Sequence, residues 1–428
     1  MTIRLPEVVR SIGTLMSGSV LGQLLALAAY PFVTRLFSPD DFGLFNVFYS
    51  YIEVMIILST GKYELAFPIV TDHAEAAALL RFTRRLNALV SVLLLTVIAL
   101  LVVLDALPGE SQSLGFIALL IPPVVFFAGS VRIHSFLFNR YQQYYPIAAS
   151  SVVYGGATSL LKIGFGLLAR IAPLFSRLGL PLATVLGQAA ADLNYVVRLR
   201  RLPTARLPRA SRQEMWRVAR KYRNFPLYVL PKDWINSFSF NLPFIWMALY
   251  FDNEVVGLFA LALTFTFRPV NIASGDIERV LYVRIHQNTV DRQPIGPFIG
   301  KFLLRVNMVA LPAFAILFFF AEPIFGWVFG SQWAPCAVYV RWLAPWCYLS
   351  LNTSVLSFIP NIFSTQCTEF LFILLLFVLW VGSMLAGILS GDFLLGVALY
   401  ALSGMLVAVM VMVWYLWQVR RYDQSVEA

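Results

Sequence analysis

The sequence predicts an all-α polytopic membrane protein of about twelve transmembrane helices, arranged as two six-helix lobes related by a parallel pseudo-two-fold repeat. The prediction rests on an apolar composition, a one-sided distribution of Lys and Arg, and a repeat at half the chain length. Hydrophobic residues make up 59% of the 428 residues and charged residues 13%, with a mean hydropathy of +0.76. A soluble protein of this length cannot bury so much apolar surface, so the excess faces lipid.

Apolar stretches of about 20 residues, the length that a helix needs to cross the hydrocarbon core, recur along the chain. The period-two alternation of a transmembrane β-barrel is absent from the sequence, which favours helices. The predicted spans are residues 11–36, 43–66, 86–104, 114–131, 145–168, 178–197, 226–249, 255–272, 302–320, 338–358, 370–389 and 393–417.

The basic residues predict the orientation of these spans. Of the 32 Lys and Arg residues, 25 fall in segments on one side of the twelve-span arrangement, and only Arg35, Arg170 and Arg177 fall on the other. Because Lys and Arg accumulate in cytoplasmic loops, both termini are predicted to be cytosolic. The net charge of +10 is explained by this asymmetry, and no aromatic-interleaved basic module indicates nucleic-acid binding.

A shift of 214 residues, half the chain, aligns two hairpins without a gap. LFSPDDFGLF, at residues 36–45, falls on YFDNEVVGLF, at residues 250–259. Gly61 and Glu64 fall on Gly275 and Glu278. Six helices, an even number, separate the copies, so both copies have the same orientation in the membrane. The predicted organisation is an N-terminal lobe (1–197), a cytosolic basic connector (198–225), a C-terminal lobe (226–417) and a cytosolic tail (418–428).

Four helices, two from each half, carry polar residues at helical spacing along one face. Isolated Ser and Thr residues join helices through hydrogen bonds, whereas four stripes related by a repeat favour a shared aqueous cleft between the lobes. The stripes are Ser19, Gln23, Tyr30 and Thr34; Asn46, Ser50, Glu53, Thr60 and Glu64; Asp233, Ser237 and Asn241; and Thr264, Asn271, Ser274 and Glu278.

The candidate substrate-binding residues are the charged and amide side chains of these stripes, together with the cations near their ends. A charged group in the bilayer must pair, approach an interface or line water. Glu53 is therefore an ion-coupling carboxylate or half of a pair, with Lys162 as a candidate partner, and Arg35 either holds a phosphate or anchors to headgroups. The candidates are Gln23, Arg35, Glu53, Lys62, Glu64, Lys232, Asp233, Asn241, Arg268, Asn271 and Glu278.

Lys232 and Asp233 begin one predicted span, and Arg268 closes the next beside Pro269. We expect them to form a cationic cytosolic vestibule that meets a diphosphate, although Arg268 could equally anchor to the interface. The basic run from Arg198 to Arg223 separates the two halves. We interpret it as a connector whose amphipathic second part lies on anionic headgroups; the alternative is a dock for cytosolic assembly enzymes.

The sequence predicts no enzyme chemistry, metal site or cofactor. It contains no GxxxxGK[ST], HExxH or nucleophile-elbow motif. His73, His134 and His286 are scattered, without a carboxylate at useful spacing, and the three cysteines have no CxxC spacing. The predicted outer loops are too short for the extracytoplasmic catalytic region of a glycan polymerase or glycosyltransferase.

Several stretches resemble the polysaccharide transporters of the MOP flippase superfamily, the Wzx-type O-antigen and exopolysaccharide repeat-unit flippases. They are TRLFSPDDFGLF, GKYELAFPI, YFDNEVVGLFALA and FGSQWAPCAVYVRWLAP. The resemblance implies six plus six helices around a cationic cavity, alternating access, and a bacterial inner-membrane location. It also implies an undecaprenyl-diphosphate-linked oligosaccharide cargo, flipped from the cytosolic to the periplasmic leaflet. The resemblance also implies that membrane lipids are partners. Whether polysaccharide assembly proteins are partners as well is not decided by the sequence.

The arginines associated with the related lipid II flippases have no counterpart here, because Gln23 and Leu25 occupy the corresponding stretch. The site residues above therefore come from the polar stripes. A multidrug or ion antiporter of the same superfamily is the nearest alternative, and a membrane glycan polymerase or glycosyltransferase is a more distant one. The sequence does not decide whether transport is coupled to H⁺ or Na⁺. Glu53, Glu64 and Asp233 are the carboxylates that would bind such an ion.

Overall fold

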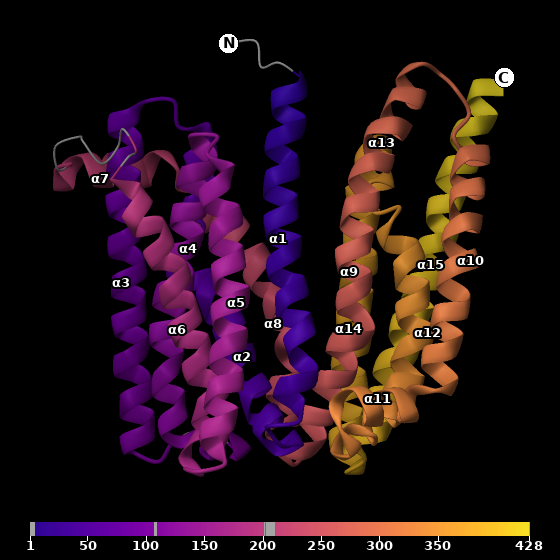
Figure 1. Cartoon of the computed structure of the whole chain (residues 1–428). Helices are drawn as coiled ribbons and strands as arrows, with labels where there is room; N and C mark the ends of the chain where they lie inside the picture. The colour runs from indigo at the N-terminus through magenta and orange to yellow at the C-terminus, as the bar shows by residue number, and fades with distance from the viewer. Residues whose placement is uncertain (1–4, 107–108, 201, 203–209, 428) are drawn as a thin grey trace. The chain divides into compact units, whose positions relative to one another are not determined.

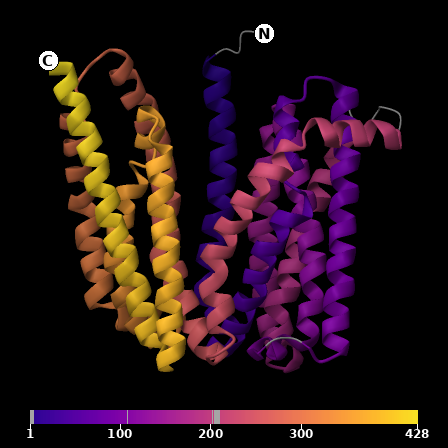
Figure 2. The same cartoon turned by 180° about the vertical axis from the view of Figure 1, so that it is seen from behind.

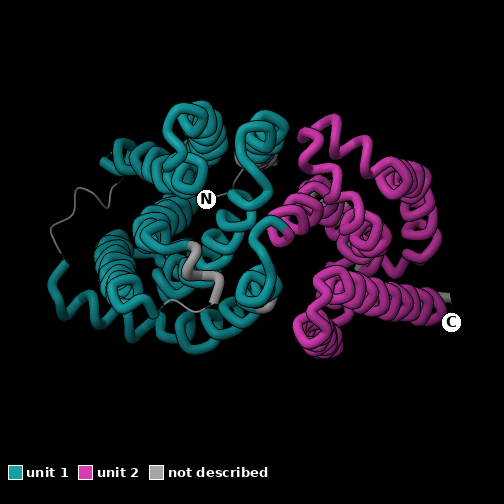
Figure 3. The backbone as a smooth tube through the Cα atoms, turned by 90° about the horizontal axis from the view of Figure 1, so that it is seen from below, with its two compact units in different colours: residues 1–254 teal, residues 255–428 magenta. Residues whose placement is uncertain are grey.

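The computed structural model describes residues 5–106, 109–200, 202 and 210–427, and every regular element in these residues is a helix. The chain forms two compact units, Met1–Glu254 and Val255–Ala428 (Figure 3). Arg4 and residues 203–209 of the predicted connector lie outside the described residues, as do the side chains of Arg10 and Ser19. The prediction of an all-α polytopic membrane protein is confirmed.

Unit 1 is a bundle of long helices that run side by side, with one short helix, α7, lying across one end of the bundle (Figures 1 and 2). Its elements are α1 (Leu5–Thr34), α2 (Pro39–Ser59), η1 (Tyr63–Ile69), α3 (His73–Val103), η2 (Gly109–Leu120), α4 (Ile121–Arg140), α5 (Tyr144–Ala169), α6 (Leu174–Leu199), α7 (Arg212–Lys221), η4 (Phe225–Val229) and α8 (Leu230–Met247).

Unit 2 is a second bundle of long helices, and its first helix begins before the unit boundary. Its apolar core includes Ile285, Cys347, Val355 and Phe358. Its elements are α9 (Asn253–Val290), α10 (Gly296–Phe319), α11 (Ala321–Phe329), η5 (Ser331–Trp333), α12 (Cys336–Ser354), α13 (Ile359–Phe363), α14 (Gln366–Ser390) and α15 (Phe393–Glu427).

Each of the twelve predicted spans coincides with a helix. Among the described residues, eight helices are long and apolar enough to cross a membrane. The other four predicted spans form α1, α6, α8 and α12. The described apolar part of α1, Val20–Thr34, is shorter than these spans, and α8 carries the charged pair Lys232 and Asp233. Helix α8 packs against α2 within unit 1, and the division into two six-helix lobes stays a prediction.

The SPDDFG part of the first hairpin is a helix-start signal. The Ser38 hydroxyl accepts a hydrogen bond from the Asp41 N–H (3.2 Å), and the Asp41 carboxylate accepts one from the Ser38 N–H (3.0 Å). This reciprocal capping box, followed by Pro39 in the first turn, fixes the start of α2. The Asn253 carbonyl oxygen occupies the space of a Gly43 side chain, so the two repeated hairpins meet at this glycine.

Small residues allow α1 and α5 to approach closely. A Cβ on Gly155 of α5 would collide with the Gly22 carbonyl oxygen of α1, whereas a Cβ on the adjacent Gly156 would meet open space. Such small-residue contacts are how helices associate in a membrane, where neighbouring apolar side chains gain little from leaving lipid.

This glycine pair provides a matched test of the α1–α5 contact. Gly155→Ala should destabilise unit 1 by about 1–3 kcal/mol, because neither helix backbone can yield locally. Gly156→Ala should be neutral or slightly stabilising, since alanine favours the helix and meets nothing. Thermal unfolding of both variants in detergent measures the difference. Equal midpoints for the two variants would contradict the close α1–α5 packing.

Candidate functional site

The backbone breaks where α2 ends. The sequence predicts one span through Ala66, and this boundary is wrong: α2 ends at Ser59, and a 3₁₀ segment, η1, begins at Tyr63. Between them Gly61 and Lys62 both have φ near 60°. Glycine adopts this left-handed conformation freely, but a lysine does so at a cost of about 1 kcal/mol.

Lys62, in the break that follows α2, forms an ion pair with Asp233 of α8. The Lys62 ammonium lies 2.8 Å from the Asp233 carboxylate, and the two side chains are 12% and 35% exposed. Asp233 stands in the first turn of α8, where a helix favours a negative charge. From the sequence, Asp233 was assigned to a cytosolic vestibule with Lys232 and Arg268, whereas Lys62 was only a separate candidate site residue. The pair was not predicted, since its two members lie far apart in the chain.

The polar stripe of α8 faces α2. The Ser237 hydroxyl donates to the Glu53 carbonyl oxygen (3.0 Å), and the Asn241 amide donates to the Ser237 carbonyl oxygen (2.9 Å). Trp234 packs against Ile56 and Ile57 of α2. Ser237 therefore joins two helices. The Lys162 ammonium lies 4.5 Å from the centre of the Phe45 ring on α2.

Glu64 is a buried acid at the same break. Its side chain is only 2% exposed, and its Oε2 has no hydrogen-bond partner among the described residues. The hydroxyl of Thr60, one turn earlier, is also buried and unpartnered in that part of the chain. Burying a carboxylate without a partner is costly. These oxygens therefore suit a proton or a small monovalent cation, the two coupling ions that the sequence left open.

The other predicted site residues of unit 1 lie on α1 and α8 or follow α1. Gln23 on α1, Arg35 just after α1, and Lys232 beside Asp233 are exposed, whereas Asn241 is buried. In unit 2, Arg268 and Asn271 are exposed on α9, and Glu278 is half-buried on the same helix. The prediction that a helix closes at Arg268 is wrong, because α9 continues to Val290 despite Pro269.

The structure adds a buried cluster that the sequence analysis missed. The His134 Nδ1 lies 2.8 Å from the Asp192 carboxylate, and its Nε2 lies 2.9 Å from the Arg84 guanidinium. A guanidinium can only donate, so Nε2 accepts and Nδ1 carries the proton that is donated to Asp192. The prediction that no carboxylate partners a histidine is wrong for His134.

Sequence spacing could not find this cluster, because its members come from α3, α4 and α6, with 58 residues between His134 and Asp192. The only indication in the sequence was energetic: a charged side chain inside a predicted span is costly to bury unless it finds a partner. Asp192 is an acid within a predicted span, and such an acid must find a partner. The His134–Asp192–Arg84 cluster joins three helices of unit 1 in a charge-balanced contact.

The comparisons with known proteins agree with this fold. A family described as "Polysaccharide biosynthesis protein" matches residues 32–338. No curated protein matches the sequence. An inward-facing multidrug resistance MATE transporter of the MOP superfamily has a TM-score of 0.70 at 15% identity, with 95% of this chain and 96% of that chain covered. The lipid II flippase MurJ, in an inward closed conformation, has a TM-score of 0.70 at 9% identity, with 98% and 90% covered.

A MOP superfamily transporter from Pyrococcus furiosus, whose binding pocket has a reversed polarity, has a TM-score of 0.58 at 14% identity, with 97% of this chain and 96% of that chain covered. At these identities the solved structures show the fold, whereas the family match covers more than half of the sequence. The predicted resemblance is thereby confirmed. The chain belongs to the polysaccharide biosynthesis protein family and has the transporter fold of the MOP superfamily.

Proposed function

We propose that this protein is a flippase that moves a polyprenyl-diphosphate-linked oligosaccharide repeat unit from the cytosolic to the periplasmic leaflet by alternating access. The observation that carries the proposal is the Lys62–Asp233 ion pair beside the buried Glu64 carboxyl, in a chain of the polysaccharide biosynthesis family. The solved flippase with the same fold acts on lipid II, according to its name.

The chemistry of the cargo explains why a cation at this position matters. Sugar hydroxyls lose a few kcal/mol each when they enter hydrocarbon without partners, and a diphosphate loses far more. Lys62 can exchange its carboxylate partner for a phosphate oxygen at little net loss, because both are charge-assisted hydrogen bonds. The partly exposed Asp233 would then be released to water. The predicted candidates Gln23, Arg35, Lys232, Arg268 and Asn271 are all exposed on their helices and could supply further polar partners.

The proposal includes a coupling ion at Glu64. A proton or Na⁺ there would neutralise a buried carboxyl, and its release would leave a buried charge that favours a different packing of the α2 break. Glu53 and Asp233 are the other carboxylates that the sequence analysis named for this role. The predicted six-helix lobes, residues 1–197 and 226–417, would be the two moving bodies, in a bacterial inner membrane with both termini cytosolic.

A strain that lacks the protein tests the proposal. It should accumulate single lipid-linked repeat units on the cytosolic leaflet and lose its surface polysaccharide, and the wild-type gene should reverse both effects. Leaflet location is measured by labelling intact spheroplasts and opened membranes with a sugar-oxidising reagent that does not cross the bilayer. Unaltered surface glycan would overturn the proposal.

Two further measurements separate the rivals. A multidrug antiporter predicts carboxylate-dependent dye efflux from vesicles that contain no polyprenyl lipid. A glycan polymerase or glycosyltransferase predicts glycan bond formation by the purified protein. We expect neither activity, since the family match and the transporter fold support movement of an intact lipid-linked cargo.

A further inference from the structure

Helix α7 is a short, strongly capped helix that the proposed transport mechanism does not use. The Ser211 hydroxyl accepts a hydrogen bond from the Glu214 N–H (3.2 Å), and the Glu214 carboxylate accepts one from the Ser211 N–H. That backbone hydrogen bond lowers the pKa of Glu214 below its usual value. Glu214 is therefore engaged in the cap, and four exposed arginines, Arg212, Arg217, Arg220 and Arg223, outnumber this one acid.

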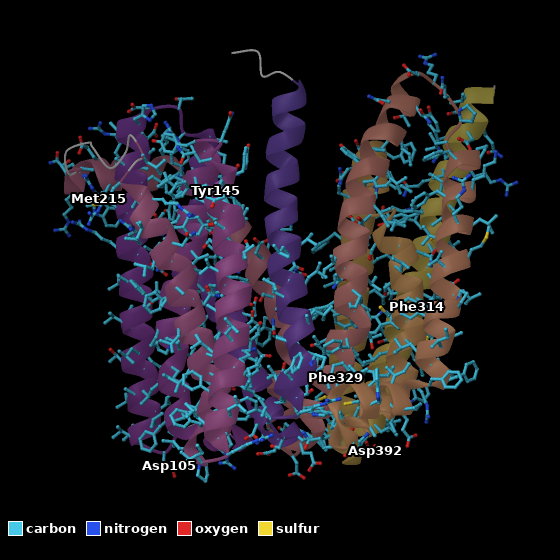
Figure 4. The ribbon with its side chains drawn as sticks, in the orientation of Figure 1. Asp105, Tyr145, Met215, Phe314, Phe329 and Asp392 are labelled. Carbon is cyan, nitrogen blue, oxygen red and sulfur yellow. The ribbon has the colours of Figure 1, made fainter. Side chains whose placement is uncertain are left out.

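The position of α7 follows from its contacts with α3. Lys221 pairs with Glu75 (2.6 Å), Trp216 lies against Phe82, and Arg85 contacts the Met215 sulfur. These contacts gather at one end of unit 1, and Figure 4 shows Met215 at the end of the bundle opposite to Asp105, which follows α3. The hydrogen bond to Glu75 raises the pKa of Lys221.

The length of α3 sets the depth of α7. A helix of 31 residues is about 46 Å long, whereas the hydrocarbon core is about 30 Å thick. The most apolar part of α3 begins near Leu86, so the part that α7 contacts, from Glu75 to Arg85, extends beyond the core. Helix α7 lies across this end of the bundle (Figure 2), and the length of α3 therefore places it at the level of the lipid headgroups.

The two faces of α7 differ sharply in chemistry. Met215, Val218 and Ala219 are buried against the bundle. The outer side exposes Trp216, which is 60% accessible, and the η4 segment that follows exposes Leu227 and Tyr228. The exposed cations on this outer side are Arg212, Arg217, Arg220 and Arg223. The two acids in contact with the helix are already engaged, Glu214 in the cap and Glu75 with Lys221.

We propose that the outer face of α7, defined by Arg212, Trp216, Arg217, Arg220 and Arg223, binds the headgroups of anionic phospholipids. Arginines supply the attraction, and an aromatic ring among them suits the boundary between headgroups and acyl chains. A purely polar acidic protein would leave Leu227, and the part of the Trp216 ring that Phe82 does not cover, without apolar partners. The proposal is independent of the transported cargo, because it concerns the surrounding lipid.

Lipid titration of the purified full-length protein tests this surface. In mixed micelles, phosphatidylglycerol should raise the thermal midpoint more than phosphatidylcholine at equal concentration. The variant Arg212→Gln/Arg217→Gln/Arg220→Gln should bind phosphatidylglycerol at least about tenfold more weakly, because each arginine near an anionic surface contributes about 1 kcal/mol and 1.4 kcal/mol is tenfold. High salt should remove the preference in the wild-type protein.

The control variant Arg170→Gln/Arg177→Gln/Arg341→Gln removes the same charge from exposed residues at the opposite ends of the predicted spans, where Arg177 and Arg341 already pair with Asp40 and Glu322. This variant should keep the preference. A second measurement does not depend on the arginine variant folding: spin-labelled phosphatidylglycerol should quench the part of the fluorescence that Trp216→Phe removes. Equal effects of both lipids, or loss of preference in the control variant alone, would overturn the proposal. The proposal would also fail if pyrophosphate added to phosphatidylcholine micelles, or an acidic peptide, raised the thermal midpoint as much as phosphatidylglycerol does.

Discussion

Lys62→Asp should reduce transfer of the lipid-linked cargo by about 100-fold or more. The substitution removes a cation whose charge-assisted bond to a phosphate is worth up to about 3 kcal/mol, and it places two carboxylates side by side. Aspartate tolerates the left-handed backbone that Lys62 occupies, so the loss should not come from local strain. Transfer by protein reconstituted in vesicles, with leaflet-selective labelling of the cargo, measures the effect.

The exchange variant Lys62→Asp/Asp233→Lys distinguishes two roles of Lys62, binding of the cargo phosphate and stabilisation of the contact with α8. It restores an ion pair between α2 and α8, although it places a cation in the first turn of α8, which costs a few tenths of a kcal/mol to about 1 kcal/mol. We expect thermal stability to recover while transfer stays low. Full recovery of transfer would show that the pair only holds the two helices together, and the cargo role of Lys62 would be rejected.

Asp192→Ala should produce the largest loss of stability among single charge removals in unit 1, about 3–5 kcal/mol. It leaves the buried His134 N–H without its acceptor and the partly buried Arg84 without the negative charge that balances it. Asp105→Asn removes an exposed carboxylate of the same unit, just after the end of α3, and asparagine tolerates the positive φ at this position. This control variant should change stability by about 0.5 kcal/mol at most. Thermal unfolding in detergent compares the two variants.

A triple apolar variant shows whether the cluster is needed as a set of charges or only as a filled space. Arg84→Met/His134→Leu/Asp192→Leu removes every charge at once, so none is left unpaired, and it should recover most of the stability that Asp192→Ala loses. If the triple variant were as unstable as the single one, the loss would come from packing volume, and the charge-balance explanation would be wrong.

Some features of the site could be predicted because they are local or repeated. The spacing of the polar residues alone predicted the polar stripes on α2 and α8, since residues four apart lie on the same face of a helix. Ser237 faces α2, as its hydrogen bond to the Glu53 carbonyl oxygen demonstrates, and the Asn241 amide bonds to Ser237 one turn back on the same helix. The sequence did not predict the break after α2. A glycine such as Gly61 is compatible with a left-handed backbone, but nothing in the sequence indicates that Lys62 adopts the same conformation.

By itself the sequence determined that this chain crosses a membrane many times as helices, and which segments do so, because lipid admits only helices whose backbone groups are paired within themselves. The tertiary structure alone decided which buried charges meet. Lys62 reaches Asp233 and His134 reaches Asp192 across different helices. Such contacts depend on the rotation of each helix about its axis and on its shift along its neighbour. The hydropathy of the sequence determines neither quantity.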